Sequence, residues 1–391
     1  MKLLKYLLSL TLFFWSGLAL ATSISLEEKI GQMLIIGFEG KTINSQSPIV
    51  KAIEENNLGG VILFDYNSRT KKFDKNIASP EQVKLLNQHL QRVTKLANRK
   101  HHRAHLPLLI SVDYEGGHVN RLKEDYGFPA THSAKEMGKM SVENIGIIAN
   151  TMADTLKTSG FNLDFAPILD VDVNPENPII GKRERSFSAI PSEVSTYAKL
   201  FSQPLIKRGV QCAYKHFPGH GSSTTDSHLG FVDVSNTWQE EELLPYRQLI
   251  AQPNHCGMIM TAHIVNRQLD ITGVPATLSH RILTGILREE LHFDGIITTD
   301  DMQMRAITDN YGLEAAVTMA INAGADMLIF GNQLTDKNQE PQEIIKIIEK
   351  KITSGDISEE RIDEAYQRIR HFKKNITKHP PTTKYYDGNH L

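Results

Sequence analysis

Residues 295–299 read GIITT and residues 257–262 read GMIMTA. After the leading glycine, both runs are apolar or β-branched on successive residues rather than on alternate ones. Such runs are typical of parallel strands that are buried on both faces of a sheet. Six similar runs bring the number of expected strands to eight: residues 34–38, 60–64, 108–112, 163–168, 211–215 and 327–330. The pattern therefore predicts a buried parallel sheet.

Helical patterns separate most of these strands. Ser79-Pro80-Glu81 opens one helix, and Pro191-Ser192-Glu193 opens another that runs to about Lys207, because serine and proline are helix-start signals. Further helices are expected from Thr237, from Ser279, over residues 310–323 and 341–354, and from Ser358 to about His371. Eight β/α units fit an α/β fold of the (β/α)₈ (TIM) barrel type, as a single domain. A doubly wound open sheet is the alternative, but no G-x-G-x-x-G follows the first strand.

The composition is that of an ordinary globular protein. The 391 residues include 43 Lys+Arg and 45 Asp+Glu, with 40% hydrophobic and 23% charged residues. These proportions exclude disorder for most of the chain. The near-neutral balance also argues against a nucleic-acid binder, which usually carries a basic surplus. Two cysteines exclude a disulfide-rich scaffold and a cysteine-based zinc site.

The two ends of the chain differ from the rest. Lys2 and Lys5 precede a mostly apolar run over residues 6–20, which ends in Ala19-Leu20-Ala21. This pattern predicts a signal peptide over residues 1–21 and an exported protein, periplasmic or secreted. The run is broken by polar residues and short for a membrane span, so an uncleaved anchor is disfavoured and no stable membrane insertion is expected. Residues 22–372 form the expected barrel, and residues 373–391 a polar tail.

Cys212 and Cys256 would face an oxidising compartment after export. Because a free cysteine behaves as a small buried hydrophobic residue, two buried thiols are the favoured interpretation. The alternative is a disulfide at the amino end of the barrel, because these cysteines lie on or just before strands five and six, which are neighbours in a barrel.

Titratable side chains gather just past the expected strand ends, where a barrel of this kind carries its catalytic groups. They are Asp113 and Glu115, Asp170 and Asp172, Lys215, His216, His220, Asp226 and His228, His263, and Asp300 and Asp301. Each has a structural alternative. Aspartate, for example, is a favoured helix N-cap. Lys215 and His216 could simply form ion pairs at the rim of the barrel. Their coincidence at strand ends favours a functional site.

Two chemistries compete for these residues. Metal-dependent hydrolysis would use His216, His220, His228 and His263 with an aspartate as ligands. Barrel metallohydrolases generally need a His-x-His pair on an early strand, and none occurs here, while the histidines at 101, 102 and 105 precede strand three at the other end. The second chemistry is nucleophilic attack on a sugar by Asp300, with another group protonating the leaving oxygen.

The segment from Lys215 to Gly221, KHFPGHG, followed by Asp226-Ser227-His228, resembles the signature of glycoside hydrolase family 3 β-N-acetylglucosaminidases. Seven further segments support the resemblance, which spans roughly residues 26–371: KIGQM at 29–33, DYEGG at 113–117, FAPILDVD at 165–172, NP at 174–175, PATLS at 275–279, TDDM at 299–302 and AGAD at 323–326.

The resemblance implies a role for each site residue. Asp300 is the nucleophile, His228 is the acid/base on a mobile loop, and Asp226 pairs with His228 and tunes it. The residues implied to hold sugar hydroxyls are Asp113, Arg121, Arg185, Lys215 and His216, and those that line the pocket are Asp170 or Asp172, and His263. Arg183 is an alternative to Arg185, because the segment before Ser186-Phe187 carries two extra residues.

The expected activity is that of an exo-acting, retaining β-N-acetylglucosaminidase on peptidoglycan fragments or chitin oligosaccharides, with no metal or other cofactor. Phosphorolysis is a related hypothesis, because a histidine acid/base repels phosphate less than a carboxylate would. The alternatives are a β-glucosidase or β-xylosidase of the same family, and a non-enzymatic exported sugar-binding barrel. The expected partner is an N-acetylglucosamine-containing glycan. We expect a monomer, because no large apolar helix face suggests an obligate partner.

Overall fold

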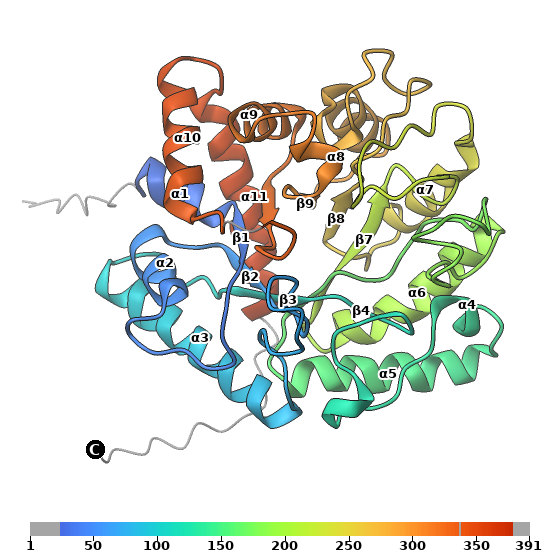
Figure 1. Cartoon of the computed structure of the whole chain (residues 1–391), viewed down its shortest axis with the longest axis horizontal. Coiled ribbons are helices and arrows are strands. Elements are labelled where there is room, and N and C mark those ends of the chain that lie inside the picture. The colour runs from blue at the N-terminus through green and yellow to red at the C-terminus, as the bar shows by residue number, and fades with distance from the viewer. Residues whose placement is uncertain (1–23, 336–337, 378–391) are drawn as a thin grey trace, which may run out of the picture.

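A computed structural model describes residues 24–335 and 338–377 of the chain. Eight parallel strands close into a barrel in the order β1-β10-β9-β8-β7-β6-β3-β2, and helices surround it (Figure 1). Each strand lies within or across one of the expected runs: β1 Leu34–Gly37, β2 Gly60–Ile62, β3 Leu109–Val112, β6 Leu163–Asp164, β7 Gln211–Phe217, β8 Met258–Thr261, β9 Ile296–Asp301 and β10 Met327–Phe330. The (β/α)₈ barrel is therefore confirmed.

β6 is shorter than the run that predicted it. It pairs with its neighbours only at Leu163 and Asp164, and the chain rejoins β7 through a single bridge between Ile168 and Lys215. Pro167 lies in this interval and has no N–H to donate to a strand ladder. The expected strand over residues 163–168 is therefore interrupted at its proline.

Most helices begin where the sequence signals predict. Ser79 caps α3 by accepting from the backbone N–H of Gln82, and proline occupies the first turn of both α3 and α6. The segment expected to start at Thr237 is instead a short turn, Glu240–Leu243, followed by α7. The helices are α1 Leu26–Gln32, α2 Pro48–Asn56, α3 Pro80–Lys100, α4 Ala134–Met137, α5 Val142–Thr158, α6 Pro191–Lys207, α7 Leu244–Ile250, α8 Arg305–Thr308, α9 Leu313–Ala323, α10 Pro341–Thr353 and α11 Glu359–Thr377, with a π-helical segment at Arg281–Glu290.

The last helix corrects the expected tail boundary at residue 373. α11 continues to Thr377, and the side chain of Lys373 is fully buried. Its ammonium donates to the side-chain oxygen of Gln32 at 2.8 Å and to the carbonyl of Gly59 at 2.6 Å. These contacts hold the helix against the amino end of the barrel, so Lys373 packs against the barrel and residues 373–377 continue the last helix. The rest of the expected tail, and the expected signal peptide, lie outside the described residues.

The two cysteines are joined, so the expectation of free thiols is wrong. Cys212 lies near the start of β7 and Cys256 lies just before β8, and their Cα atoms are 4.9 Å apart with an S–S bond of 2.08 Å. The β7–β8 register pairs Ala213 with Met258, which brings both cysteines to the amino end of the same strand pair. The register of the two neighbouring strands brings the cysteines within bonding distance, although an isolated cysteine is more often a free buried thiol.

A hairpin that the strand pattern did not predict follows β3. β4 (Tyr114–Gly116) and β5 (Val119–Asn120) pair in antiparallel fashion beside the barrel. Gly116 and Gly117 turn the hairpin with φ of +95° and +56°, a region that side chains other than glycine rarely adopt.

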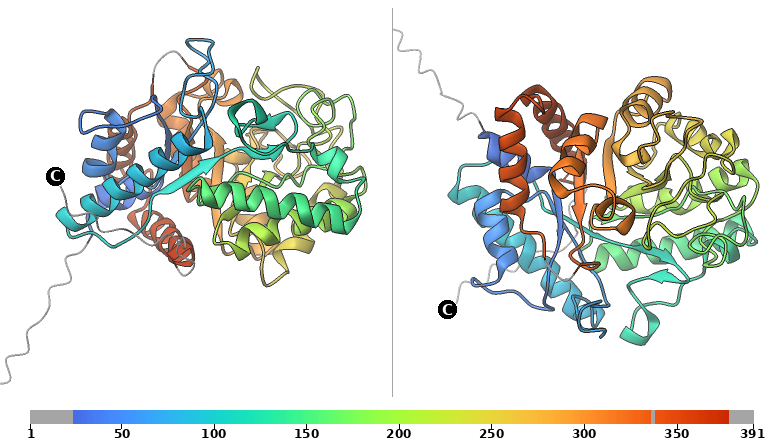
Figure 2. Two further views of the ribbon diagram at one scale, coloured as in Figure 1. Left: turned by 90° about the horizontal axis from the view of Figure 1, so that it is seen from below. Right: turned by 45° about the horizontal axis from the view of Figure 1, so that its top comes forward.

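The loops that follow β2 and β7 rise on the same side of the barrel (Figure 2, left).

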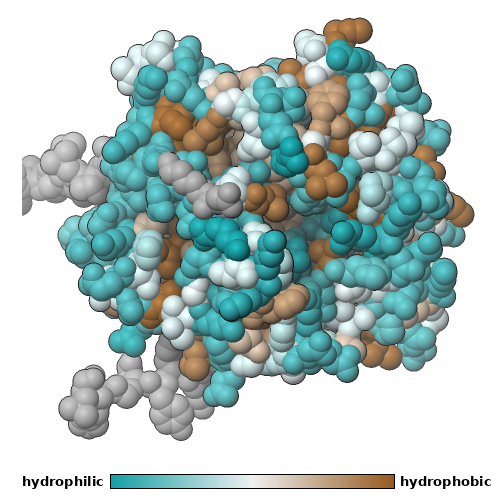
Figure 3. All heavy atoms as spheres, viewed as in Figure 1, coloured by the Kyte–Doolittle hydropathy of each residue, from teal (hydrophilic) through white to brown (hydrophobic). Residues whose placement is uncertain are grey.

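The face that Figure 3 presents is mostly hydrophilic, with hydrophobic side chains scattered singly or in small groups. Among residues 24–335 and 338–377, no helix combines the length and the apolar character that crossing a bilayer requires.

Candidate active site

Three barrel strands deliver the central polar side chains. β7 carries Lys215 and His216 near its carboxyl end, β9 carries Asp300, and Asp113 directly follows β3. Because all barrel strands run parallel, their carboxyl ends meet at one face, and the structure brings these residues together there. The peptide bond between Lys215 and His216 is cis.

Two cations and two carboxylates form a buried network. Lys215 donates to Asp113 at 2.9 Å and lies 2.6 Å from Glu115. Arg185 binds both oxygens of Glu115 at 2.8 Å in a bidentate pair. Burial alone would raise the pKa of Glu115, but the charges of Arg185 and Lys215 outweigh it and lower that pKa. The four groups therefore stay charged and present fixed hydrogen-bonding groups to a polar ligand.

Arg121 and Asp113 lie at the more open side of this network. Arg121 Nη2 is 3.6 Å from Asp113 Oδ2, and these side chains are 31% and 17% exposed. Within the described part of the chain, Arg121 Nε is buried without a hydrogen-bond partner. Burial would raise the pKa of Asp113, but the charges of Lys215 and Arg121 hold it below its usual range. Arg121 Nε–H is therefore a donor without a partner in the described part of the chain, and it belongs to the side chain beside the ionised Asp113.

His216 is oriented by a buried aspartate. Its Nδ1 lies 2.7 Å from Asp170 Oδ2, and the backbone N–H groups of His216 and His220 donate to Asp170 Oδ1 at 3.2 and 2.8 Å. An ionised carboxylate only accepts, so Nδ1 carries the proton and Nε2 is left facing Arg185 Nη2 at 3.5 Å. Of the two expected pocket aspartates, Asp170 is therefore the one that contacts His216.

Asp300 sits among three imidazoles. Burial would raise the pKa of its carboxyl, but the charges of His263, His216 and His228 outweigh burial and lower it. Its Oδ1 accepts the N–H of Asp301 at 2.7 Å. His263 is itself held by the Asp301 carbonyl, 3.0 Å from Nε2, and by Thr277 Oγ1, 2.8 Å from Nδ1. Asp300 is therefore an ionised carboxylate on a rigid strand, as a nucleophile requires.

The loop after β7 carries the predicted pair. His228 Nδ1 lies 2.8 Å from Asp226 Oδ1, which also accepts the backbone N–H of His228 at 2.8 Å. Burial alone would lower the pKa of His228, but the hydrogen bond to Asp226 and the charge of Asp300 raise it. The His228 side chain is 45% exposed. The imidazole is therefore an accessible acid whose protonated form is favoured by two carboxylates.

Glu115 was expected at a strand end, but the sequence assigned it no role of its own. Glu115 contacts both Lys215 and Arg185 and is 5% exposed. A signal was present, because Glu115 stands two residues from Asp113 and side chains two apart in an extended segment share a side. The alternative Arg183 is exposed, whereas Arg185 is buried in the network.

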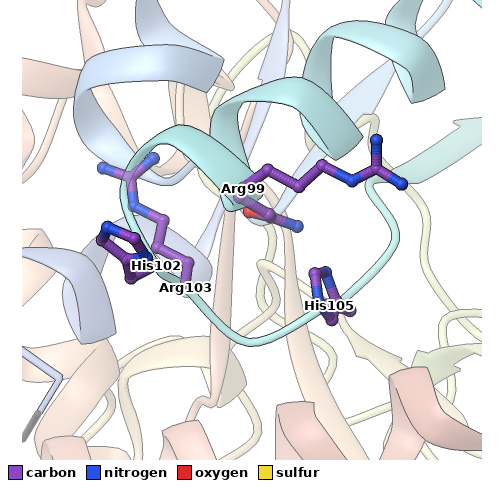
Figure 4. Close-up of a pocket in the computed structure, with 5 residues that line it drawn as sticks. Arg99, His102, Arg103 and His105 are labelled. Carbon is purple, nitrogen blue, oxygen red and sulfur yellow. The ribbon is translucent and has the colours of Figure 1, made fainter.

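The histidines that precede strand three lie away from this site. His102 and His105 line a shallow cavity with Arg99 and Arg103 between α3 and β3, at the amino end of that strand (Figure 4). Arg103 is occupied there by Glu28 at 2.6 Å and by α2 carbonyls. Among residues 24–335 and 338–377, no group of three or more His, Cys, Asp or Glu side chains is arranged to hold a metal ion.

Comparison with known proteins points to one family. Residues 25–372 match the glycosyl hydrolase family 3 N terminal domain. A β-hexosaminidase of Idiomarina loihiensis is 37% identical over 66% of this chain and 75% of its own length. The β-hexosaminidase LpqI of Mycobacterium tuberculosis is 33% identical over 68% of this chain and 67% of its own length.

Solved structures share the fold. A glycoside hydrolase family 3 β-N-acetylglucosaminidase from Paenibacillus superposes with a TM-score of 0.82 at 30% identity over 94% of this chain. The present chain spans 65% of that protein's length. A β-N-acetylhexosaminidase from Beutenbergia cavernae gives a TM-score of 0.77 at 25% identity, with 90% of this chain and 99% of that one covered. The barrel, its strand-end residues and these relatives together establish that the chain belongs to glycoside hydrolase family 3.

Proposed function

We propose that this protein is an exo-acting, retaining β-N-acetylglucosaminidase that releases terminal N-acetylglucosamine through a covalent glycosyl-aspartate intermediate. The observation that carries the proposal is electrostatic. Asp300 and His228 shift each other's pKa values toward the ionised carboxylate and the protonated imidazole. A retaining glycosidase needs that combination of nucleophile and acid. The β-hexosaminidase relatives support a glycoside hydrolase of this kind.

In the first step, an Asp300 oxygen attacks the anomeric carbon while His228 Nε2–H gives its proton to the departing glycosidic oxygen. Asp226 holds Nδ1–H throughout, which fixes the tautomer and supports the positive charge before transfer. In the second step, neutral His228 takes a proton from water. The water oxygen attacks the anomeric carbon and displaces Asp300. The anomeric configuration is retained because two inversions occur.

We further propose that the buried network binds the sugar in front of Asp300. Lys215 donates to two carboxylates and keeps one of its three N–H groups for a sugar hydroxyl. Asp113 and Arg121 offer an acceptor and a donor toward the opening, while Arg185 and His216 contribute from deeper positions. Paired charges suit an uncharged sugar, because they supply directional hydrogen bonds without attracting counter-ions.

We propose export, on the N-terminal signal pattern and on the disulfide between Cys212 and Cys256, which persists in oxidising compartments. Peptidoglycan fragments or chitin oligosaccharides are the proposed natural substrates. The mostly hydrophilic face in Figure 3 accords with a carbohydrate ligand.

The test replaces Asp300 with asparagine, which keeps the shape of the side chain but removes the nucleophile. We expect kcat on an aryl N-acetyl-β-glucosaminide to fall by at least about 10³-fold, since the covalent step is lost. The melting temperature should stay close to that of the wild type. Wild-type turnover by this variant would refute the assignment. The same assay with aryl β-glucosides and β-xylosides separates the other family activities, and sugar 1-phosphate formed on adding phosphate would indicate phosphorolysis.

A further inference from the structure

The loop that carries His228 has one buried residue in an exposed run. Ser227 is 2% exposed, while its neighbours Thr224, Thr225, His228 and Leu229 are all exposed. The N–H of Leu229 donates to the Asp226 carbonyl at 3.0 Å, so residues 226–229 form a turn. Within that turn the Ser227 side chain is buried in the barrel face while His228 stays accessible.

Ser227 makes two contacts outside this turn. Its hydroxyl lies 3.2 Å from Nε2 of His220, and its carbonyl accepts the N–H of Ala306, the second residue of α8, at 3.3 Å. A serine hydroxyl donates or accepts, so either neutral tautomer of the imidazole forms this bond. The hydroxyl contact therefore links the turn to His220, which lies just after β7.

His220 is buried and held in place, so it can anchor the Ser227 side chain. It is 2% exposed, and its backbone N–H donates to Asp170 at 2.8 Å, the same carboxylate that orients His216. In the described part of the chain its Nδ1 is buried without a partner, and burial lowers its pKa to about 4. The ring is therefore neutral near pH 7, and its side-chain hydrogen bond goes to the loop.

We propose that His220 and Ser227 act as a latch that positions His228 for proton transfer. The inference rests on the proposed role of His228 as acid/base. A proton donor must come within about 3 Å of the glycosidic oxygen, and misplacement by about 1 Å costs up to about 100-fold in rate. His228 shares its turn with Ser227, so the contact between the Ser227 side chain and His220 fixes the position of the neighbouring imidazole. His220 and Ser227 are positioning residues and touch no reacting atom.

The test measures kcat/KM over a series of aryl N-acetyl-β-glucosaminides whose leaving phenols differ in pKa. In Ser227→Ala and in His220→Asn, whose shorter side chain does not reach the hydroxyl, we expect about a tenfold loss with the poorest leaving groups, the effect of one net hydrogen bond. Activated phenols need little protonation, so their kcat/KM should change less than about twofold. The double variant should lose no more than either single variant, because both changes break the same contact.

Three controls make the result decisive. Ser227→Thr and His220→Gln keep a hydroxyl or an amide at the contact and should restore most of the loss, whereas exposed Thr224→Ala should behave as the wild type. A loss that is equal for all leaving groups, or no loss at all, would overturn the latch. His228→Ala in the same series should show a steep leaving-group dependence. If it does not, the proposed acid/base role fails, and that failure is distinct from loss of the latch alone.

Discussion

Lys215, Arg185, Asp113 and Glu115 place two positive and two negative charges in a region that water scarcely reaches. Each charge would be costly to bury alone, and the network is tolerable because every cation has a carboxylate partner. Glu115 is the residue on which both cations converge. Its loss would leave Arg185 without its bidentate partner and Lys215 with Asp113 only.

Glu115→Gln should therefore be the most damaging neutralisation in the site. We expect a destabilisation of about 3 kcal/mol, the usual cost of removing one partner from a buried ion pair. Chemical denaturation measures it, and Glu176→Gln is the matched control, because Glu176 pairs with Lys182 on the surface with 81% of its side chain exposed. Exposed pairs contribute about 0–1 kcal/mol, so equal effects of the two variants would contradict this account.

Asp226 raises the pKa of His228. It holds the protonated form of His228, so removing its charge should lower the pKa of His228. In the proposed mechanism His228 must be protonated for the first step, so we expect activity to be lost as pH rises through its pKa. In Asp226→Asn, the alkaline limb of the kcat/KM profile should therefore move to lower pH, by about one unit at this half-exposed position. The acid limb reports Asp300 and should move little, and an alkaline limb that stays in place would count against the pairing.

At the scale of elements, the segment from Pro218 to Gly221 is clamped on both sides. Trp238 Nε1–H donates to the Pro218 carbonyl at 3.2 Å, and the Gly221 N–H donates to Glu242 at 3.1 Å. A Cβ at Gly221 would lie only 1.7 Å from the Val171 carbonyl oxygen, so this loop packs backbone to backbone against the segment after β6. The loop that leads to His228 therefore starts from a fixed base.

Gly221→Ala should push these two segments apart. We expect a destabilisation of about 2 kcal/mol or more, because a close backbone contact has no side chain that can yield, and a parallel loss of kcat. Gly146→Ala is the control: it lies inside α5 with open space around its Cβ and should stabilise the protein by up to about 1 kcal/mol. Thermal unfolding followed by circular dichroism compares both variants with the wild type. An unchanged melting temperature in Gly221→Ala would contradict the packing.

At the scale of the whole molecule, the disulfide and the proposed active site lie at opposite ends of the barrel. The disulfide between Cys212 and Cys256 joins β7 to the start of β8 at the amino end, and Lys373 ties α11 to the same end. The charged network and Asp300 lie at the carboxyl ends of the strands, and His228 lies on the loop after β7. The disulfide and the Lys373 contacts therefore lie away from the loop that carries His228, the proposed acid/base.

Replacing both cysteines by alanine should therefore lower stability without changing the chemistry. A bond that closes a loop across 44 residues of sequence contributes about 2–4 kcal/mol, which should appear as a lower melting temperature. The value of kcat/KM should stay within about twofold of the wild type, because neither cysteine is near the site. Thiol counting on the unreduced wild-type protein should find no free thiol, and two free thiols would refute the bond.

How far the sequence predicts this structure depends on the range of the interactions. The strand positions follow from local runs such as residues 295–299, and the start of α3 follows from Ser79 and Pro80, since hydrophobic periodicity and capping act over a few residues. The early end of β6 and the last turns of α11 were missed. The first depends on a proline inside an apolar run, and the second on a lysine whose partners lie more than 300 residues away.

By itself, the sequence determined the eight-stranded barrel, its family resemblance and the identity of the strand-end residues, because burial pattern and motif order are properties of the linear chain. Only the tertiary structure decided that Cys212 meets Cys256, that Arg185 rather than Arg183 joins Glu115, and that Ser227 is seated against His220. The first two contacts join groups on separate strands or loops, and the third joins two residues seven apart in the loop after β7. Which pairs meet is set by barrel closure and register, and those depend on packing of the whole chain.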